Sequence, residues 1–509
     1  MQPLTPAEWP AEWPAATTSG GGNFTLSAWA VRYPWREGRT SSGVFTSSDA
    51  TLNAVWNLCR DTLRSTSLDT TTDSNTRERL PYEADAYITG LSRLALQAEY
   101  EWPRHSWMHT LRNPTWPTEW RQTAALMAHA DWYATGELDV YSQLADALSA
   151  QTQRACLNAT TGLIDFRACP RQTGGLGCGH EAKLRDLVDW PPVYRDGFVL
   201  SDAANTVVNA YAVGGLRAMA EMVNASGNAS GAAELADTAD RVADGVNALL
   251  WDDKSGAYRD GLASTGAPID HTAWHASVFA AAFGLVPSSR WPALLALFRR
   301  RGMVGSVYAA FFLLQALYQA PHDHGQLALE VLTSCSKHSW CNMLREGATA
   351  TMEAWSPDEK PNLSWSHPWA SAPASAVVWG LFGVRPLQPG WKTVEVRPQP
   401  GNLSWATIRV PSIRGPISIA FNQSAAQSCS RATEQAHLQR LSSCFFHLTL
   451  QLPRAMGASV CLPRLGRMDS MLRVDGVPAS GRLAGDFVCI NVPEDDGDVT
   501  VRLLRDARE

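Results

Sequence analysis

Carboxylates crowd one short segment near the start of the chain. Residues 73–85, DSNTRERLPYEAD, hold four carboxylates and two guanidiniums within thirteen positions. Hydrolysis with acid catalysis needs a carboxyl group that stays protonated, and neighbouring negative charge raises the pKa of such a group. The segment is therefore a candidate acid site. The alternative is a solvated loop before an ordinary helix start, with Pro81 in the first turn and Glu83 and Asp85 favoured by the helix dipole.

A second polar segment lies far downstream. Residues 347–355, GATATMEAW, place Glu353 among small and aromatic side chains, where an acid costs free energy unless it is paired or functional. The alternative is a partly exposed glutamate at the end of a helix. Glu359 is predicted in an exposed loop. His367 lies between two tryptophans, which favours either a sugar platform or a packed core histidine.

Helices are predicted to position both segments. From about residue 48 to 383, apolar residues recur at spacings of three and four between Gly, Pro and Asx positions. About a dozen helices in six hairpins favour a mainly α fold, an (α/α)6 toroid (six-hairpin barrel). A solenoid is the alternative, but no fixed-period repeat is present. The predicted helices are 49–66, 82–101, 119–135, 138–154, 201–223, 230–250, 271–285, 289–301, 304–319, 323–338, 342–354 and 369–384.

Several helix boundaries are marked by their residues. We expect a turn at Thr135 and Gly136, an N-cap at Ser201 and Asp202, and a helix end at Gly302.

After Pro386 the pattern changes to short alternating runs, which predict strands at 393–397, 406–410, 417–421, 444–452, 457–462 and 497–504. Turn residues between them favour a C-terminal antiparallel β-sandwich. We expect domains at 48–385 for the helical part and 386–509 for the sandwich. Residues 23–47 are predicted as a remnant strand and linker, and residues 1–22 as disordered.

Charge and hydropathy argue against two kinds of partner. The 509 residues carry a formal net charge of −6, and no run of Lys or Arg is longer than the three arginines at 299–301, so neither nucleic acid nor an anionic membrane is expected to bind. No apolar stretch reaches the roughly 20 residues that span a bilayer. A soluble protein is predicted, and at 45% hydrophobic content it has enough apolar residues for a large core.

Seven N-x-[ST] sequons and ten cysteines indicate the secretory pathway. Disulfides are favoured by close cysteines in loop-like sequence, as with Cys169 and Cys178, Cys335 and Cys341, and Cys429 and Cys444. No C-x-x-C pair supports a zinc site. A signal peptide is not visible, so we expect an incomplete N-terminus on a glycoprotein that is secreted or held in a secretory or vacuolar lumen. The sequons are at Asn23, Asn158, Asn224, Asn228, Asn362, Asn402 and Asn422.

The two polar segments, in this order, resemble the catalytic motifs of glycoside hydrolase family 78, the α-L-rhamnosidases. The resemblance runs from about residue 43 to 422 and implies an (α/α)6 barrel. It also implies that Glu78 is the general acid and Glu353 the general base. Side chains that the resemblance implies around the sugar are Asp73, Arg77, Asp85, Asp189, Trp190 and His367.

The resemblance implies release of terminal α-L-rhamnose with inversion, for which a protonated carboxyl and a water-activating carboxylate suffice, without metal or organic cofactor. The C5 methyl of rhamnose needs an apolar wall, and the candidates are Tyr82, Trp190, Trp355 and Trp369. Tyr82 stands where many members carry Trp, and Ser74 and Asn75 replace a common Cys-Pro. The alternatives are another (α/α)6 glycosidase or lyase of different specificity, or a non-catalytic carbohydrate-binding protein.

Overall fold

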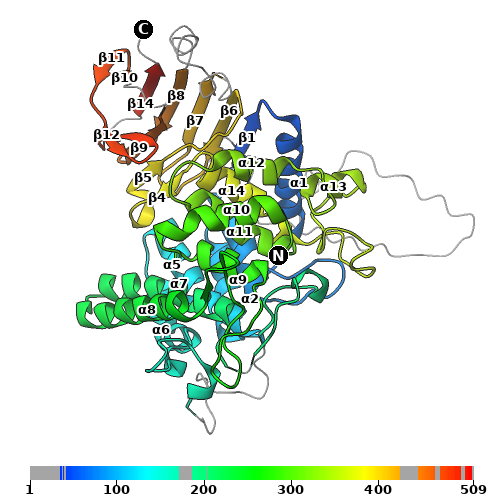
Figure 1. The fold of residues 1–509 in the computed structure, drawn as a ribbon. Helices are drawn as coiled ribbons and strands as arrows, with labels where there is room; N and C mark the ends of the chain where they lie inside the picture. Colours follow the sequence, from blue (N-terminus) through cyan, green and yellow to red (C-terminus); the bar gives the residue numbers. More distant parts are fainter. Residues whose placement is uncertain are drawn as a thin grey trace, which may run out of the picture.

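The computed structural model describes residues 35, 36, 38, 42–170, 186–201, 203–424, 445–464, 471–494 and 499–506. The predicted disordered segment 1–22 and most of the predicted strand and linker region lie outside these residues. In Figure 1 the strands gather at one end of the molecule, and the N-terminal strand β1 (Val44–Ser47) lies beside them. The predicted order of a mainly α part followed by a β part is confirmed.

Six helices form a closed inner ring. Each one packs against the next, and the last packs against the first. These helices are apolar on all sides, as expected for helices with neighbours all round; α9 is buried along its whole length, and α11 at every side chain except Gln315 and Gln319. The inner helices are α2 (Glu83–Leu94), α5 (Thr123–Thr135), α7 (Thr206–Ala225), α9 (Trp274–Ala282), α11 (Val307–Gln319) and α14 (Ala372–Ala376).

An outer helix precedes each inner helix along the chain, which gives six hairpins. Outer helices bury only one face: α8 buries Leu235, Val242 and Val246 at helical spacing. The predicted toroid is therefore confirmed. The outer helices are α1 (Ala50–Thr66), α3 (Glu101–Arg112), α6 (Asp139–Gln151), α8 (Ala229–Leu249), α10 (Trp291–Arg301) and α12 (Gly325–Thr333), with the short α4 (Thr118–Arg121) and α13 (Trp340–Arg345) in the connections.

Most helix ends follow the residues that predicted them. Gly136 ends α5 with φ of 86°, and Gly302 ends α10 with φ of 62°, both as expected. The predicted cap at residues 201 and 202 is wrong. Helix α7 begins after Asn205, whose side chain accepts hydrogen bonds from two backbone N–H groups of the first turn.

Helix α3 was not predicted, because residues 82–101 were assigned to a single helix. The chain leaves the helical path after Leu94 and starts α3 at Glu101. Pro103 fits within α3, because in the first turn its missing N–H has no intrahelical partner to lose.

The predicted helix 342–354 is also wrong. The observed helix in this region, α13, ends at Arg345, and Gly347 follows with φ of 85°. Residues 347–355 then run as a loop whose backbone groups bond to other segments: the Thr351 N–H donates to Thr62 Oγ1 at 2.7 Å, and the Glu353 N–H donates to the Ser364 carbonyl at 2.9 Å. Glu353 therefore lies in an anchored loop, not at the end of a helix.

The β part consists of two sheets that share one apolar core with the helices. The predicted strands are present, and their side chains alternate between buried and exposed, as in β6 and β8. The seven-stranded sheet has the order β1 (Val44–Ser47), β6 (Trp405–Val410), β7 (Ile417–Gln423), β8 (Phe445–Leu452), β14 (Val499–Asp506), β10 (Met471–Val474), β11 (Val477–Ala479). The five-stranded sheet has the order β12 (Arg482–Ala484), β13 (Phe487–Val492), β9 (Gly457–Pro463), β5 (Thr393–Val396), β4 (Arg385–Pro386).

One strand pair departs from the antiparallel expectation. Strands β5 and β9 are parallel, because the chain passes through β6, β7 and β8 of the other sheet before it returns. A two-stranded hairpin, β2 (Trp251–Asp252) and β3 (Ala257–Tyr258), lies within the helical part. None of the described helices is long and apolar enough to cross a membrane.

Three disulfides join cysteines of the described residues. Cys335 pairs with Cys341 as expected. Cys169, however, pairs with Cys156, which precedes it by 13 positions, and not with Cys178; Cys178, Cys429 and Cys444 lie outside the described residues. The third bridge joins Cys461 of β9 to Cys489, its partner in register on β13.

Candidate active site

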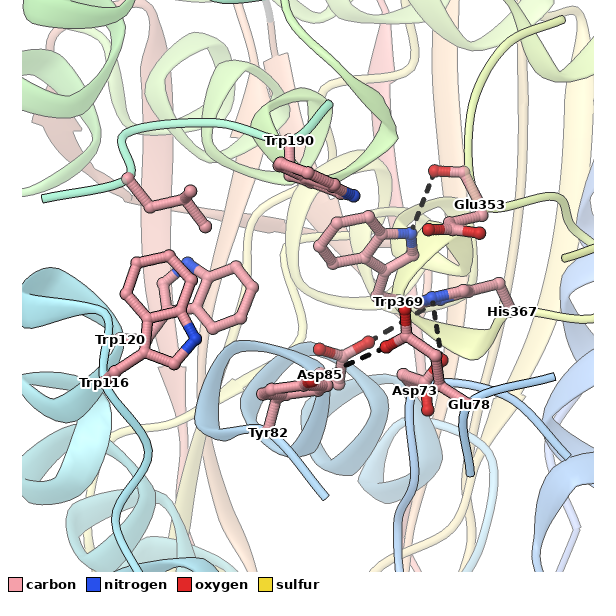
Figure 2. Close-up of a pocket in the computed structure, with 11 residues that line it drawn as sticks. Asp73, Glu78, Tyr82, Asp85, Trp116, Trp120, Trp190, Glu353, His367 and Trp369 are labelled. Carbon is pink, nitrogen blue, oxygen red and sulfur yellow. Dashed lines mark hydrogen bonds and ion pairs between the residues drawn. The ribbon is translucent and has the colours of Figure 1, made fainter. Parts of the chain in front are cut away.

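One pocket forms where the loop before α2 meets the loop after α13. Figure 2 shows carboxylates and His367 on one side of it, and the indoles of Trp116 and Trp120 on the other. Because its walls come from distant parts of the chain, the pocket exists only in the closed ring. The lining residues are Asp73, Glu78, Tyr82, Asp85, Trp116, Trp120, Leu187, Trp190, Glu353, His367 and Trp369.

The loop of residues 73–82 is fixed by its own backbone. The Asp73 N–H donates to the Leu80 carbonyl at 2.8 Å, and the Leu80 N–H donates to Asp73 Oδ1 at 2.8 Å. Arg79 takes φ of 62°, a left-handed conformation that lets the chain turn back. This closed loop carries Glu78 at its tip and leads into α2, whose first turn holds Asp85.

Glu353 is buried and surrounded by donors. Its Oε2 accepts the Ser364 N–H at 2.9 Å, and Lys360 Nζ lies 3.3 Å from its Oε1. Only 3% of its side chain is exposed. A buried carboxyl group costs free energy unless it is paired, and these donors provide the pairing.

Arg77 connects the two glutamates. One terminal nitrogen of its guanidinium donates to Glu78 Oε1 at 2.9 Å, and the other donates to both carboxylate oxygens of Glu353 at 3.0 and 2.9 Å. Glu78 is 39% exposed at the side chain, in contrast to the buried Glu353. Two carboxyl groups, one deep and one at the mouth, therefore face one pocket with a cation between them.

Deeper in the pocket, three buried side chains each have one polar atom without a hydrogen-bond partner among the described residues. His367 lies 3.8 Å from Asp73 Oδ2 and 3.6 Å from Asp85 Oδ1, too far for good hydrogen bonds. Asp73 Oδ2, Asp85 Oδ1 and His367 Nδ1 have no partner. Buried polar atoms left in this state are costly, so their grouping on one pocket indicates a ligand with hydroxyl groups.

Burial dominates the electrostatics of these three groups. It raises the pKa of Asp73. Burial, together with the charges of Asp73 and Glu353, raises the pKa of Asp85 well above its usual range. Burial and the positive charges of Arg77 and Lys360 lower the pKa of His367 well below its usual range, so the imidazole is neutral.

Aromatic rings form the remaining walls. Trp120 contacts Tyr82 and Trp369 with ring centroids 5.7 and 6.3 Å apart, and Trp369 Nε1 donates to the Glu353 carbonyl at 3.3 Å. Burial, followed by the charge of Glu78, raises the pKa of Tyr82 to about 12. Tyr82 therefore keeps its proton, and its hydroxyl lies 3.5 Å from Glu78 Oε2.

Comparisons with known proteins identify the family of the chain. The sequence profile of the bacterial alpha-L-rhamnosidase 6 hairpin glycosidase domain matches residues 40–377. The chain belongs to this family. The profile of the bacterial alpha-L-rhamnosidase C-terminal domain matches residues 383–431. A search of curated protein sequences finds no match.

Solved structures share the fold of this rhamnosidase-family chain. The family 78 rhamnosidase of Bacillus sp. GL1 has 24% identity and a TM-score of 0.64, over 76% of this chain and 41% of that one. The Streptomyces avermitilis alpha-L-rhamnosidase complexed with L-rhamnose has 18% identity and a TM-score of 0.65, over 91% and 42%. The alpha-L-rhamnosidase of Dictyoglumus thermophilum has 15% identity and a TM-score of 0.70, over 92% and 51%. The chain thus spans about half the length of these proteins or less.

The rhamnosidase-family pocket gathers most of the side chains that the sequence singled out. Three of the predicted site residues do not line it: Arg77, Asp189 and Trp355. Arg77 contacts both glutamates instead. Asp189 is fully buried and bonds to His275 Nε2 at 2.7 Å and to the Ser306 N–H at 2.8 Å. Trp355 is fully buried, with Nε1 donating to the Gly305 carbonyl at 2.9 Å.

Sequence reasoning missed three lining residues: Trp116, Trp120 and Leu187. The sequence WPTEW at 116–120 contains two of them, and its aromatic content was the available signal, but nothing local indicated which of the many tryptophans face the pocket.

Glu359 is not in an exposed loop as predicted. Its side chain is 15% exposed, and it accepts a hydrogen bond from the Tyr194 hydroxyl at 2.6 Å and lies 2.8 Å from His338 Nε2.

Two histidine pairs, His105 with His109 and His271 with His275, have the spacing of helical metal ligands. Yet across the described ranges no three His, Cys, Asp or Glu side chains group as a metal site would require.

Proposed function

We propose that this chain is an α-L-rhamnosidase that removes terminal α-L-rhamnose from glycosides with inversion at the anomeric carbon. One observation carries the proposal: Glu78 and Glu353 contact the same guanidinium in one pocket. Inverting glycosidases need two carboxyl groups about 6.5–9.5 Å apart, with a water between one of them and the sugar. The Arg77 guanidinium between the two groups supports such a separation, because it holds them from direct contact.

In this proposal Glu353 is the general base. Its carboxylate is buried among Arg77, Lys360 and the Ser364 N–H, which favour the charged form that a base needs. Glu78 is the general acid. It lies at the mouth, where the leaving group departs, and its carboxyl oxygen is near the Tyr82 hydroxyl.

The remaining side chains hold the sugar. Asp73, Asp85 and the neutral His367 are proposed to bind rhamnose hydroxyls, because each has a buried polar atom without a partner. The carboxyl oxygens of Asp73 and Asp85 also carry partial negative charge, which would favour the positive charge that develops on the sugar in the transition state. Tyr82, Trp190 and Trp369 are proposed to form the apolar wall for the C5 methyl group.

Asp189 and Trp355 have proposed roles as supports for the pocket. Asp189 ties the segment that carries Trp190 to Ser306, which caps α11. Trp355 packs edge-on against Trp340 at 5.1 Å and fixes the chain just after Glu353.

The direct test is hydrolysis of 4-nitrophenyl α-L-rhamnoside beside the matching β-glucoside and β-glucuronide. We expect nitrophenol release from the rhamnoside alone. Preference for the glucoside or the glucuronide would assign another sugar to the same pocket, and binding of rhamnose without any release would indicate a carbohydrate-binding protein.

We also propose that the protein matures in the secretory pathway. Its described disulfides fit an oxidising compartment. Of the six sequon asparagines within the described residues, all except the half-buried Asn158 are exposed, so the surface leaves room for glycans.

A further inference from the structure

Two of the tryptophans that line the pocket are partly open to solvent. Trp116 and Trp190 line the pocket and are 40% and 37% exposed, whereas Trp120 and Trp369 are buried deeper in it. In the reaction proposed above, the leaving group takes its proton from Glu78 and lies outside the sugar pocket. The part of the substrate beyond the rhamnose must therefore rest on side chains at the mouth, on the side of Glu78.

Trp365 lies on a fixed segment of backbone beside the loop that carries Glu78. Its neighbour Ser364 donates its N–H to Glu353 at 2.9 Å, and the Ser364 hydroxyl lies 3.1 Å from the hydroxyl of Thr76, in the loop that carries Glu78. Two positions later His367 lines the pocket, and its N–H donates to the Thr351 carbonyl at 2.8 Å. The chain is thus anchored before and after Trp365, next to both glutamates.

The indole of Trp365 remains open to solvent. It is 46% exposed, and it has neither a hydrogen bond nor a ring contact with any other residue that the structure describes. It does not line the rhamnose pocket itself. An indole is rigid, and its backbone here is already ordered, so a ring that stacks on it gains contact area with little loss of conformational freedom.

We propose that Trp365 is the platform for the leaving group and determines specificity for rhamnosides whose aglycone presents a ring face, either an aryl group or a second sugar. This inference rests on the proposed rhamnosidase function. Both kinds of ring share the chemistry that the indole recognises, a flat or C–H-rich apolar face. An alkyl aglycone offers no such face and gains nothing from Trp365.

The test compares Trp365→Ala with the wild type on three substrates: methyl α-L-rhamnoside, 4-nitrophenyl α-L-rhamnoside and an α-L-rhamnosyl-glucose disaccharide. For each substrate, kcat/KM of the variant is divided by kcat/KM of the wild type, which removes intrinsic differences in leaving-group reactivity. We expect kcat/KM to fall about 5- to 10-fold on the ring-bearing substrates, mainly through KM, and by less than about 2-fold on the methyl glycoside. Trp365→Phe should restore most of the loss.

Trp405→Ala is the matched control, because Trp405 on β6 is 43% exposed and belongs to the sheet; it should leave all three ratios unchanged. A selective loss on one ring substrate supports the inference and identifies the aglycone as aryl or sugar. Equal losses on all three substrates, or no loss on either ring substrate, would overturn the platform while the rhamnosidase function stands. A wild type that cleaves none of the three would overturn the proposed function, and the inference with it.

Discussion

At the scale of single residues, Arg77 links the side chains of Glu78 and Glu353. Its guanidinium donates to both carboxylates, but only Glu353 receives two of the bonds and is buried. Hydrogen bonds from an ion strengthen as water is excluded. Glu353 is thus the more tightly held of the two carboxyl groups, and Glu78 is the one open to solvent.

We expect Glu78→Gln to separate substrates by their leaving groups. On a natural glycoside, whose leaving oxygen needs protonation, kcat/KM should fall at least about 100-fold. On an aryl rhamnoside with an acidic phenol the loss should be below about 10-fold, because little protonation is needed. Steady-state kinetics on both substrates decides the matter, and equal losses would argue against an acid role for Glu78.

Glu353→Gln should behave differently, because no leaving group replaces the activation of water. We expect a loss of at least about 100-fold on both substrates, with partial recovery in azide, a small anion that attacks without a base. Glu330→Gln, on the exposed face of α12, is the control. Retention of more than about a tenth of the wild-type rate would remove Glu353 from the mechanism.

At the scale of elements, one short segment builds the wall that holds Leu187 and Trp190. A buried glutamate in α4, Glu119, accepts the N–H groups of Leu187 and Val188, the latter at 2.6 Å. Val188 is fully buried and takes φ of 65°, which is costly for a β-branched residue and persists only where its surroundings fix it. The pocket wall therefore depends on a carboxylate that no substrate touches.

Glu119 makes stability depend on pH. Burial, followed by the negative charge of Asp186, raises its pKa from 4.5 to about 8. Because the folded state binds the proton more tightly, the stability linked to this group is complete below pH 4.5 and is lost as the pH rises to about 8.

Glu119→Gln keeps the side chain neutral at every pH. We therefore expect the free energy of unfolding of the variant, relative to that of the wild type, to rise by at least about 1 kcal/mol between pH 5 and pH 8, because one unit of pKa shift corresponds to about 1.4 kcal/mol. Urea unfolding at both pH values measures this, with Glu330→Gln as the exposed control. A difference that does not change with pH would contradict the shifted titration of Glu119.

At the scale of the whole molecule, disulfides close loops in both parts of the chain. The three described bridges span 13, 6 and 28 positions. Each is expected to contribute about 2–4 kcal/mol through the unfolded state, so reduction should lower the midpoint of thermal unfolding. Mass spectrometry of protein from its own host tests the secretory origin, and fully reduced cysteines with unmodified sequons would contradict it.

The closed ring also underlies the stereochemical prediction. Ring closure brings the loop before α2 against the loop after α13, so that Glu78 and Glu353 line one pocket from different elements. A retaining enzyme would need its carboxyl groups only about 5–5.5 Å apart. We expect proton NMR to show β-L-rhamnose as the first product, before mutarotation. Initial α-rhamnose, or a covalent glycosyl-enzyme at either glutamate, would contradict inversion.

The sequence by itself determined the helical hairpins, the change to strands near Pro386 and the two acidic segments. Amphipathic period, glycine stops and alternating strands are local properties, which is why Gly136 and Gly302 end helices as expected. The resemblance of the 73–85 and 347–355 segments to known motifs added the candidate acid and base, a prediction that awaits the kinetic tests.

Tertiary structure decided which side chains meet. Residues 347–355 have a helical pattern, yet they form a loop because Thr62 and Ser364 bind their backbone groups. Trp116 and Trp120 line the pocket, and Trp355 is fully buried outside its lining, although the sequence favoured Trp355 and neither of the other two. Such choices depend on contacts between residues hundreds of positions apart. Periodicity cannot encode them, because the free energy of burying a tryptophan depends on the neighbours that the closed ring supplies.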